Sequence, residues 1–232
     1  MALTVPTGGE MRRRAFLAYG EVAGGGEFAT ATMNTFMNRA VTRFALDSGI
    51  VVGSCRKARP VNTTTAPGEA LATMPAGLFD PRRVVHERRA YAGAAYYTDL
   101  RHTTQRYLAL AYGPEWSYAI GSEAGVAPTA MRWYRKGSQI VGFFPGNMSG
   151  HTVGTAVIWC SKVPDPMNTD TAPLTIPAEY ADGIVSDVCR RMAERDVDSD
   201  SEGKRAASFE AETQTWIQRA RAQVRSRWDS ED

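Results

Sequence analysis

The chain has 232 residues, 43% of them hydrophobic, so it is long enough to bury a core of its own. Its 27 basic and 25 acidic residues leave a formal net charge of +2, which argues against a protein that coats nucleic acid and against a strongly acidic one. Three widely spaced cysteines exclude a paired disulfide framework. No window approaches the roughly 20 apolar residues of a membrane span, so we expect no membrane partner.

Two helices are predicted near the N-terminus. The first covers about residues 10–19 and ends before the glycines at 24–26. The second covers about 28–46, where apolar residues recur at three- and four-residue steps until the turn residues at 47–49. Two helices this close in sequence, each with an apolar face, are expected to pack as a hairpin that makes up the first region, residues 1–48.

A β-rich second region is predicted over residues 49–162. Its early extended candidates are 50–52, 61–65 and 83–89, which are rich in valine and threonine. The stretch at 99–112 is ambiguous, and its leucines and Tyr107 favour an inward-facing helix.

Three β-favouring runs follow at 131–135, 139–144 and 153–160, separated by turn residues, and they predict an antiparallel meander. The runs carry five large aromatic side chains whose alternation indicates a core, although a platform that stacks single-stranded nucleic acid is the alternative. These are Trp133, Tyr134, Phe143, Phe144 and Trp159.

The third region, residues 163–232, begins as a proline-marked linker and continues as two helices. Thr175 can cap the first helix and Pro177 suits its first position. Apolar residues then fall four apart from Tyr180 to Met192, which requires a buried face. The sequence therefore predicts an α+β fold, with a helical bundle from the N- and C-terminal helices and a central antiparallel β meander or sandwich.

The last helix is predicted at about 204–228, after an acidic loop at 196–203. From Trp216 onward it combines two tryptophans with four arginines, the residue types that dominate interface energies. Two interpretations stay open: the helix closes the bundle, or it docks onto a partner, and both can hold. The candidate partner-binding residues are Trp216, Arg219, Arg221, Arg225, Arg227 and Trp228.

Catalytic patterns are scarce. His86, His102 and His151 lie too far apart for a zinc motif, and no Gly-x-Ser-x-Gly elbow is present. Glu179 and Asp182 could form an acid/base pair, but negative charge in a first helical turn explains them without function. We therefore predict no catalytic, cofactor-binding or metal-binding residues and no cofactor.

The order of short motifs along the chain resembles the head-to-tail adaptor proteins of tailed bacteriophages, of the head-completion or tail-tubular-A type. Each motif is short, so the resemblance depends mainly on their order over about residues 28–228. In sequence order they lie at 37–40 (Met-Asn-Arg-Ala), 74–79 (Met-Pro-Ala-Gly-Leu-Phe), 125–134, 140–145 (ending in proline), Trp159 and 176–180 (Ile-Pro-Ala-Glu-Tyr).

The resemblance implies a structural virion protein without catalysis. It implies a ring of twelve copies at the portal vertex, assembled in the host cytoplasm, that binds the portal protein and a downstream tail or nozzle protein. Double-stranded DNA would pass through the lumen without sequence-specific binding, for genome retention and ejection. The partner-binding residues of the last helix would then contact the portal. The alternatives are a phage hydrolase of cell wall or nucleic acid, and a single-stranded nucleic-acid-binding module.

Overall fold

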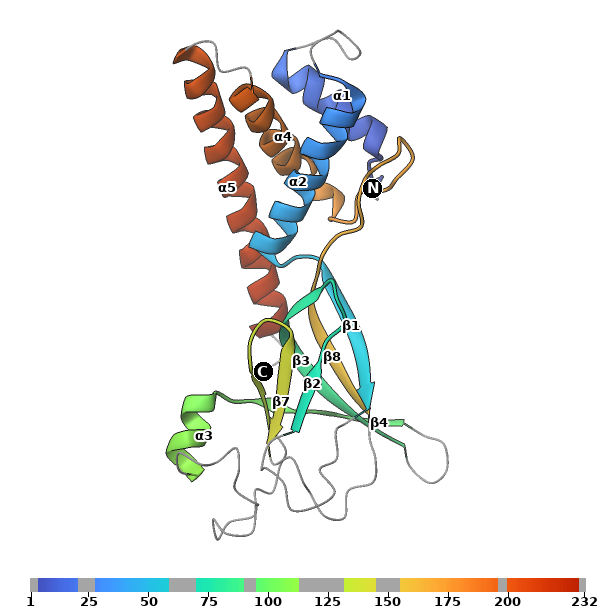
Figure 1. The fold of residues 1–232 in the computed structure, drawn as a ribbon, viewed down its shortest axis with the longest axis vertical. Coiled ribbons are helices and arrows are strands. Elements are labelled where there is room, and N and C mark those ends of the chain that lie inside the picture. The colour runs from blue at the N-terminus through green and yellow to red at the C-terminus, as the bar shows by residue number, and fades with distance from the viewer. Residues whose placement is uncertain are drawn as a thin grey trace. The chain divides into compact units, whose positions relative to one another are not determined.

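The two ends of the chain form one compact unit and its middle forms another in the computed structural model. We call residues 1–51 and 162–232 the helical unit, and residues 52–161 the sheet unit. The structure describes residues 4–20, 28–58, 70–89, 95–112, 132–144, 155–195 and 200–229. The predicted α+β fold, with terminal helices in one bundle and antiparallel sheets in the middle, is confirmed (Figure 1).

The helical unit is built around α4, which packs against each of the other three helices of the unit. N-terminal and C-terminal helices lie side by side in it (Figure 1). α1 and α2 contact each other, and each contacts α4 more extensively. The elements are α1 (Gly8–Tyr19), α2 (Thr30–Ser48), a 3-10 turn η1 (Ala178–Tyr180), α4 (Ala181–Arg195) and α5 (Asp200–Asp229).

The apolar period of α4 explains its central place. Tyr180, Ile184, Val188 and Met192, predicted to share a face, are all buried. The predicted cap is wrong, because the buried hydroxyl of Thr175 has no hydrogen-bond partner among the described residues. Instead, the chain enters α4 through the 3-10 turn that follows Pro177.

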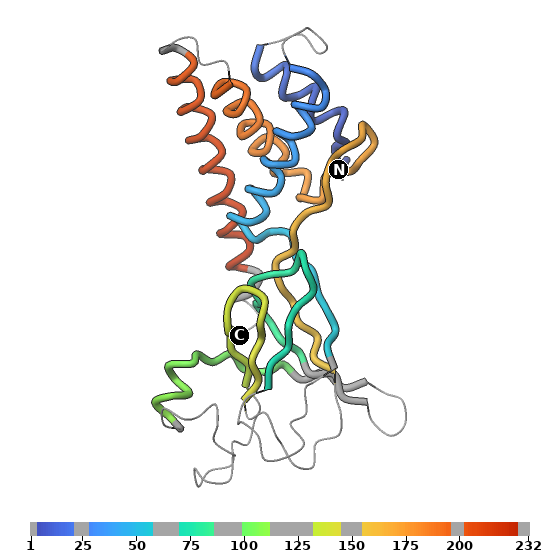
Figure 2. The backbone as a smooth tube through the Cα atoms, viewed as in Figure 1, coloured from blue at the N-terminus to red at the C-terminus, as the bar shows by residue number. Residues whose placement is uncertain are grey.

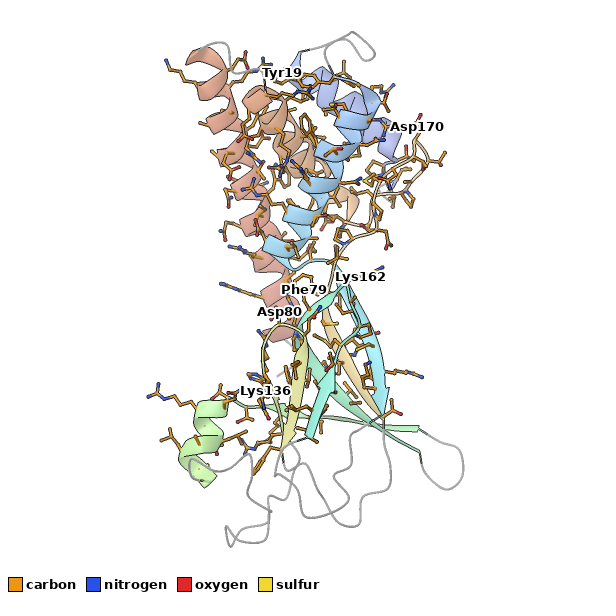
Figure 3. The ribbon with its side chains drawn as sticks, in the orientation of Figure 1. Tyr19, Phe79, Asp80, Lys136, Lys162 and Asp170 are labelled. Carbon is orange, nitrogen blue, oxygen red and sulfur yellow. The ribbon has the colours of Figure 1, made fainter. Side chains whose placement is uncertain are left out.

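Residues 163–177, which we call the strap, tie the start of α4 to the N-terminal helices (Figure 2). Backbone amides of Gly8 and Gly9 donate to carbonyls of Ala172 and Asp170, at 2.9 and 3.0 Å. The Asn38 side-chain oxygen accepts from the Met167 amide at 2.7 Å, while the Met167 side chain is fully buried. Asp170, labelled in Figure 3, also accepts from the buried Arg12.

The sheet unit contains two four-stranded sheets, ordered β1-β8-β3-β4 and β2-β7-β6-β5. The pairs β1–β8, β3–β4, β2–β7 and β6–β7 are antiparallel, whereas β5–β6 is parallel. The elements are β1 (Val52–Ala58), β2 (Ala70–Thr73), β3 (Leu78–Arg89), β4 (Ala95–Asp99), β5 (Arg101–His102), α3 (Gln105–Tyr112), β6 (Arg132–Arg135), β7 (Ile140–Phe144) and β8 (Thr155–Lys162).

Three details of the sheet unit differ from the sequence predictions. β6 and β7 form the expected hairpin, with Gly137 at φ 113°, but β8 joins the other sheet, so the three runs are not one meander. The helix predicted from residue 99 begins at Gln105, after the short strand β5. The strand predicted at 61–65 lies outside the described residues.

Both sheets contribute to one apolar core. Trp133 and Phe143 from one sheet and Ile158 from the other are at most 2% exposed and belong to the same cluster. Tyr134 and Phe144 are buried in a second cluster under α3. Four of the five aromatic residues are therefore core residues, as favoured from their alternation, and only Trp159 is partly exposed, at 38%.

Candidate docking site on the last helix

The C-terminal half of α5 has an inward and an outward side. Ile217, Ala220 and Val224 are buried in the core of the helical unit. Arg219 and Arg225 are exposed. The predicted helix therefore closes the bundle with one side and leaves arginines on the other.

Trp216 belongs mostly to the bundle. It packs against the core cluster and makes an edge-to-face contact with Tyr180, with ring centroids 6.4 Å apart. A methyl group added at Gly183 would lie only 2.5 Å from Cβ of Trp216, so the glycine allows α4 and α5 to approach closely here. The side chain helps to fix the direction of α5.

The four arginines predicted as partner-binding residues have different surroundings. The Arg219 guanidinium lies 4.9 Å from the centroid of the Trp216 ring. Arg221 donates to the Asp47 carbonyl at 2.6 Å, which links α5 to the end of α2. Among the described residues, neither Arg219 nor Arg225 forms an ion pair. Arg227 and Trp228 lie in the last turns of α5, and their side chains are outside the described part of the chain.

A network of ion pairs around a buried carboxylate connects α5 to α2 and α4. Asp187 of α4, with its side chain 2% exposed, accepts from Arg43 of α2 at 2.6 Å and from Arg190 at 2.9 Å. Arg191 adds a third cation at 3.0 Å. Arg43 also binds Glu210 of α5 at 2.5 Å, so one arginine connects three helices.

Electrostatics of this network favour the charged forms. The hydrogen bond from Arg43 is the main cause that lowers the pKa of Glu210 from 4.5 to about 2. The same bond raises the pKa of the Arg43 guanidinium above its ordinary value, against the opposing effect of burial. The start of α5 is held by a separate set of contacts. The hydroxyl of Tyr19 in α1, labelled in Figure 3, donates to the Glu202 carboxylate at 3.2 Å. The Arg205 guanidinium lies 4.3 Å from the centroid of the Tyr19 ring. α5 is thus fixed along its length.

The family model described as SU10 adaptor protein matches residues 6–231, which is nearly the whole chain. The chain belongs to the SU10 adaptor protein family. It is a phage head-to-tail adaptor, as the resemblance implied, and its family is one of structural proteins that bind other virion proteins. A comparison with curated proteins gave no match. In the described part of the adaptor, the helices are too short or too polar to span a bilayer.

Three of the residues considered for catalysis in the SU10 adaptor make hydrogen bonds, ion pairs or ring contacts within the fold. Glu179 accepts from Gln223 at 3.2 Å, and Asp182 lies 3.8 Å from Arg14. His102 contacts the Trp133 ring, and burial, followed by the charge of Arg135, lowers its pKa.

The other two histidines give no information on a metal site. The His86 side chain and all of His151 lie outside the described residues. In the ranges that the structure describes, no three histidine, cysteine or acidic side chains gather as a metal site would require. The residues that could have been catalytic or metal-binding therefore supply no assembled site in the described part of the adaptor.

Sequence reasoning missed the Asp187 network. A signal was present, because Asp187 with Arg190 and Arg191 has the i,i+3 and i,i+4 spacing of helix ion pairs. The link to Arg43 and Glu210 could not be read from spacing, since these residues come from two other helices.

Proposed function

We propose that this adaptor forms a closed ring of twelve copies at the portal vertex of the virion, between the portal protein and the tail or nozzle protein. It would be assembled in the host cytoplasm and would line the path of the genome during retention and ejection. The observation that carries the proposal is the family match over residues 6–231, since a head-to-tail adaptor must bind on two sides.

The outward side of α5 is the proposed portal-binding surface, and its exposed residues Arg219 and Arg225 are its centre. Trp216, Arg221, Arg227 and Trp228 stay candidates for portal binding from the sequence. Arginines without an internal carboxylate partner are available to pair with carboxylates of another protein. Because α5 is held by Trp216 and the Asp187 network, little order would be lost on docking. Arginine and tryptophan, which lie together at Arg219 and Trp216, are typical of the residues that dominate interface energies.

A ring of identical copies requires two different complementary faces that meet head to tail and close. DNA must move through such a ring, so its lumen should not hold phosphates tightly. The near-neutral charge balance of the chain agrees with that requirement, because strong neutralisation of phosphates would oppose sliding. We expect the purified protein to bind DNA weakly and without sequence preference.

The test is the double charge reversal Arg219→Glu with Arg225→Glu. The variant should fold normally but join DNA-filled heads at least about tenfold less well than the unchanged protein. Lys204→Glu is the matched control, because it reverses an exposed charge nearer the start of α5. Deletion from residue 216 is a poor test, since it also removes the buried Ile217 and Ala220.

Normal joining by the double variant would contradict the proposed portal surface. Strong, salt-sensitive binding of duplex DNA by the purified protein would contradict the proposed lumen. The two experiments are independent, so failure of one leaves the other proposal in place.

A further inference from the structure

The sheet unit presents a second exposed surface, on α3. The buried Leu108 and the neighbouring Ala109 pack this helix onto Tyr134 and Phe144. On the other side, Tyr107 is 48% exposed and Leu110 is 79% exposed. Leu110 is the most exposed large apolar side chain in the described part of the chain.

Three arginines lie on α3 or on the two strands paired beside it. Arg101 and Arg106 are exposed, and Arg132 places its guanidinium 5.1 Å from the centroid of the Tyr107 ring. Arg101 and Arg132 are also register partners in the parallel pair β5–β6, an arrangement of like charges that costs stability. None of the three forms an ion pair with a carboxylate of the described residues.

The surrounding sequence explains this charge. Between Asp99 and Glu115 the chain has no acidic residue. Asp99 itself is paired with Arg83 at 2.7 Å, and the hydrogen bond from Arg83 lowers its pKa. The nearby Asp80 pairs with Arg135 at 2.5 Å (Figure 3). Asp99 and Asp80 are thus already paired with other arginines.

We propose that α3 is a docking helix for a virion protein other than the portal. Its partner surface would be an apolar pocket that receives Leu110 and Tyr107, bordered by carboxylates that pair with Arg101, Arg106 and Arg132. Fixed like charges beside exposed apolar side chains are a cost to the free protein, and an acidic apolar partner removes that cost. The inference rests on the proposed function, since an adaptor needs a second partner.

The chemistry favours a protein over DNA. DNA phosphates would pair with the arginines but would leave Leu110 in water. Contact with a second copy of the chain is an outcome that the crosslinking experiment below distinguishes. A pocket with apolar walls and an acidic border on the tail or nozzle protein would bury Leu110 and also pair with the arginines.

A photo-crosslinking amino acid placed at position 110 of the full chain tests the occupant directly. After assembly into particles and irradiation, we expect a crosslink to a tail or nozzle protein, within a segment that contains aspartate or glutamate. The same crosslinker at the exposed Leu17 of α1 is the control and should not give that product. Crosslinks from position 110 only to DNA, only to another adaptor copy, only to the portal, or to nothing would overturn the proposal.

Two substitutions separate this proposal from the portal proposal. Leu110→Asp and Arg106→Glu should each give adaptor-bound heads that acquire tails at least about tenfold less often. Leu17→Asp should leave tail attachment unchanged. If the α3 variants attach tails normally, the docking helix is wrong although the adaptor function stands. If the unchanged adaptor is absent from heads and tails alike, the proposed function itself fails.

Discussion

The helical unit and the sheet unit are stabilised by different kinds of contact. In the helical unit the buried carboxylate of Asp187 forms ion pairs with three arginines and so connects α2 and α4. One of these arginines, Arg43, also pairs with Glu210 of α5. In the sheet unit none of the described carboxylates in an ion pair is buried as Asp187 is, and the core is filled by Trp133, Phe143 and their apolar neighbours. Charged contacts fix direction, whereas apolar packing mainly fills volume.

That difference teaches how each proposed docking helix is held. α5 is fixed by directional contacts along its length, which suits a surface that must meet its partner without reordering. α3 is held mainly by Leu108 over Tyr134 and Phe144. We therefore expect the two surfaces to respond differently to changes in the core beneath them.

The largest effect is expected in the sheet core. Trp133→Ala should lower the free energy of unfolding by about 4 kcal/mol, because it leaves a large cavity between the two sheets. Trp159→Ala is the matched control: its side chain is 38% exposed, and the loss should be about 1 kcal/mol. Urea unfolding of both variants measures the difference, and equal losses would mean that the two sheets do not share the core described.

The next effect concerns the buried carboxylate of the helical unit. Asp187→Asn should lower the free energy of unfolding by about 3 kcal/mol, because three arginines lose their shared counter-charge. Asp182→Asn on the same helix, with its side chain 69% exposed, should cost about 0.5 kcal/mol or less. A small loss for Asp187→Asn in urea unfolding would show that apolar packing alone holds the bundle.

Alanine substitutions at two glycines should change the stability of the protein in opposite directions. Gly183→Ala should destabilise the protein by about 2 kcal/mol, because the added methyl group meets Trp216. Gly203→Ala should stabilise it by about 0.5 kcal/mol, since Gly203 lies in α5 with no atom close to the added group. Thermal unfolding measures both. A stabilising Gly183→Ala would contradict the close approach of α4 and α5.

The smallest effect depends on pH. Because the folded pKa of Glu210 is lowered from 4.5 to about 2, its contribution to stability is complete above about pH 4.5 and is lost as the pH falls toward 2. Glu210→Gln should therefore cost roughly 1 kcal/mol at neutral pH, allowing for solvent screening, and this difference should shrink across that window. Glu212→Gln controls for loss of one negative charge from α5. A cost independent of pH would contradict the ion pair with Arg43.

The spacing of apolar residues predicted those helices that form from the local sequence, whichever element they pack against. The four-residue spacing from Tyr180 to Met192 and the apolar steps within α2 predicted helices that the structure contains. The order of short motifs also predicted the family correctly. Each of these signals lies within one local stretch of sequence or in the order of such stretches.

Sequence reasoning failed where the outcome depends on non-local partners. The β8 run alternates like its predecessors, but its pairing with β1 depends on a strand about a hundred residues earlier, which spacing does not reveal. The extensive packing of α1 and α2 against α4 also involves a helix far along the chain, which the spacing of apolar residues does not reveal. At the candidate site, composition identified the arginines of α5, but only the fold separates Arg221, bound to Asp47, from the exposed Arg225.

Imaging of the portal vertex in mature particles, at a resolution that separates helices, tests the proposed ring and its portal surface most directly. We predict a closed, rotationally symmetric ring of this chain between portal and tail, with the outward side of α5 from Arg219 to Arg225 against the portal. A vertex without this protein, or a ring in which that side of α5 faces away from the portal, would contradict the account.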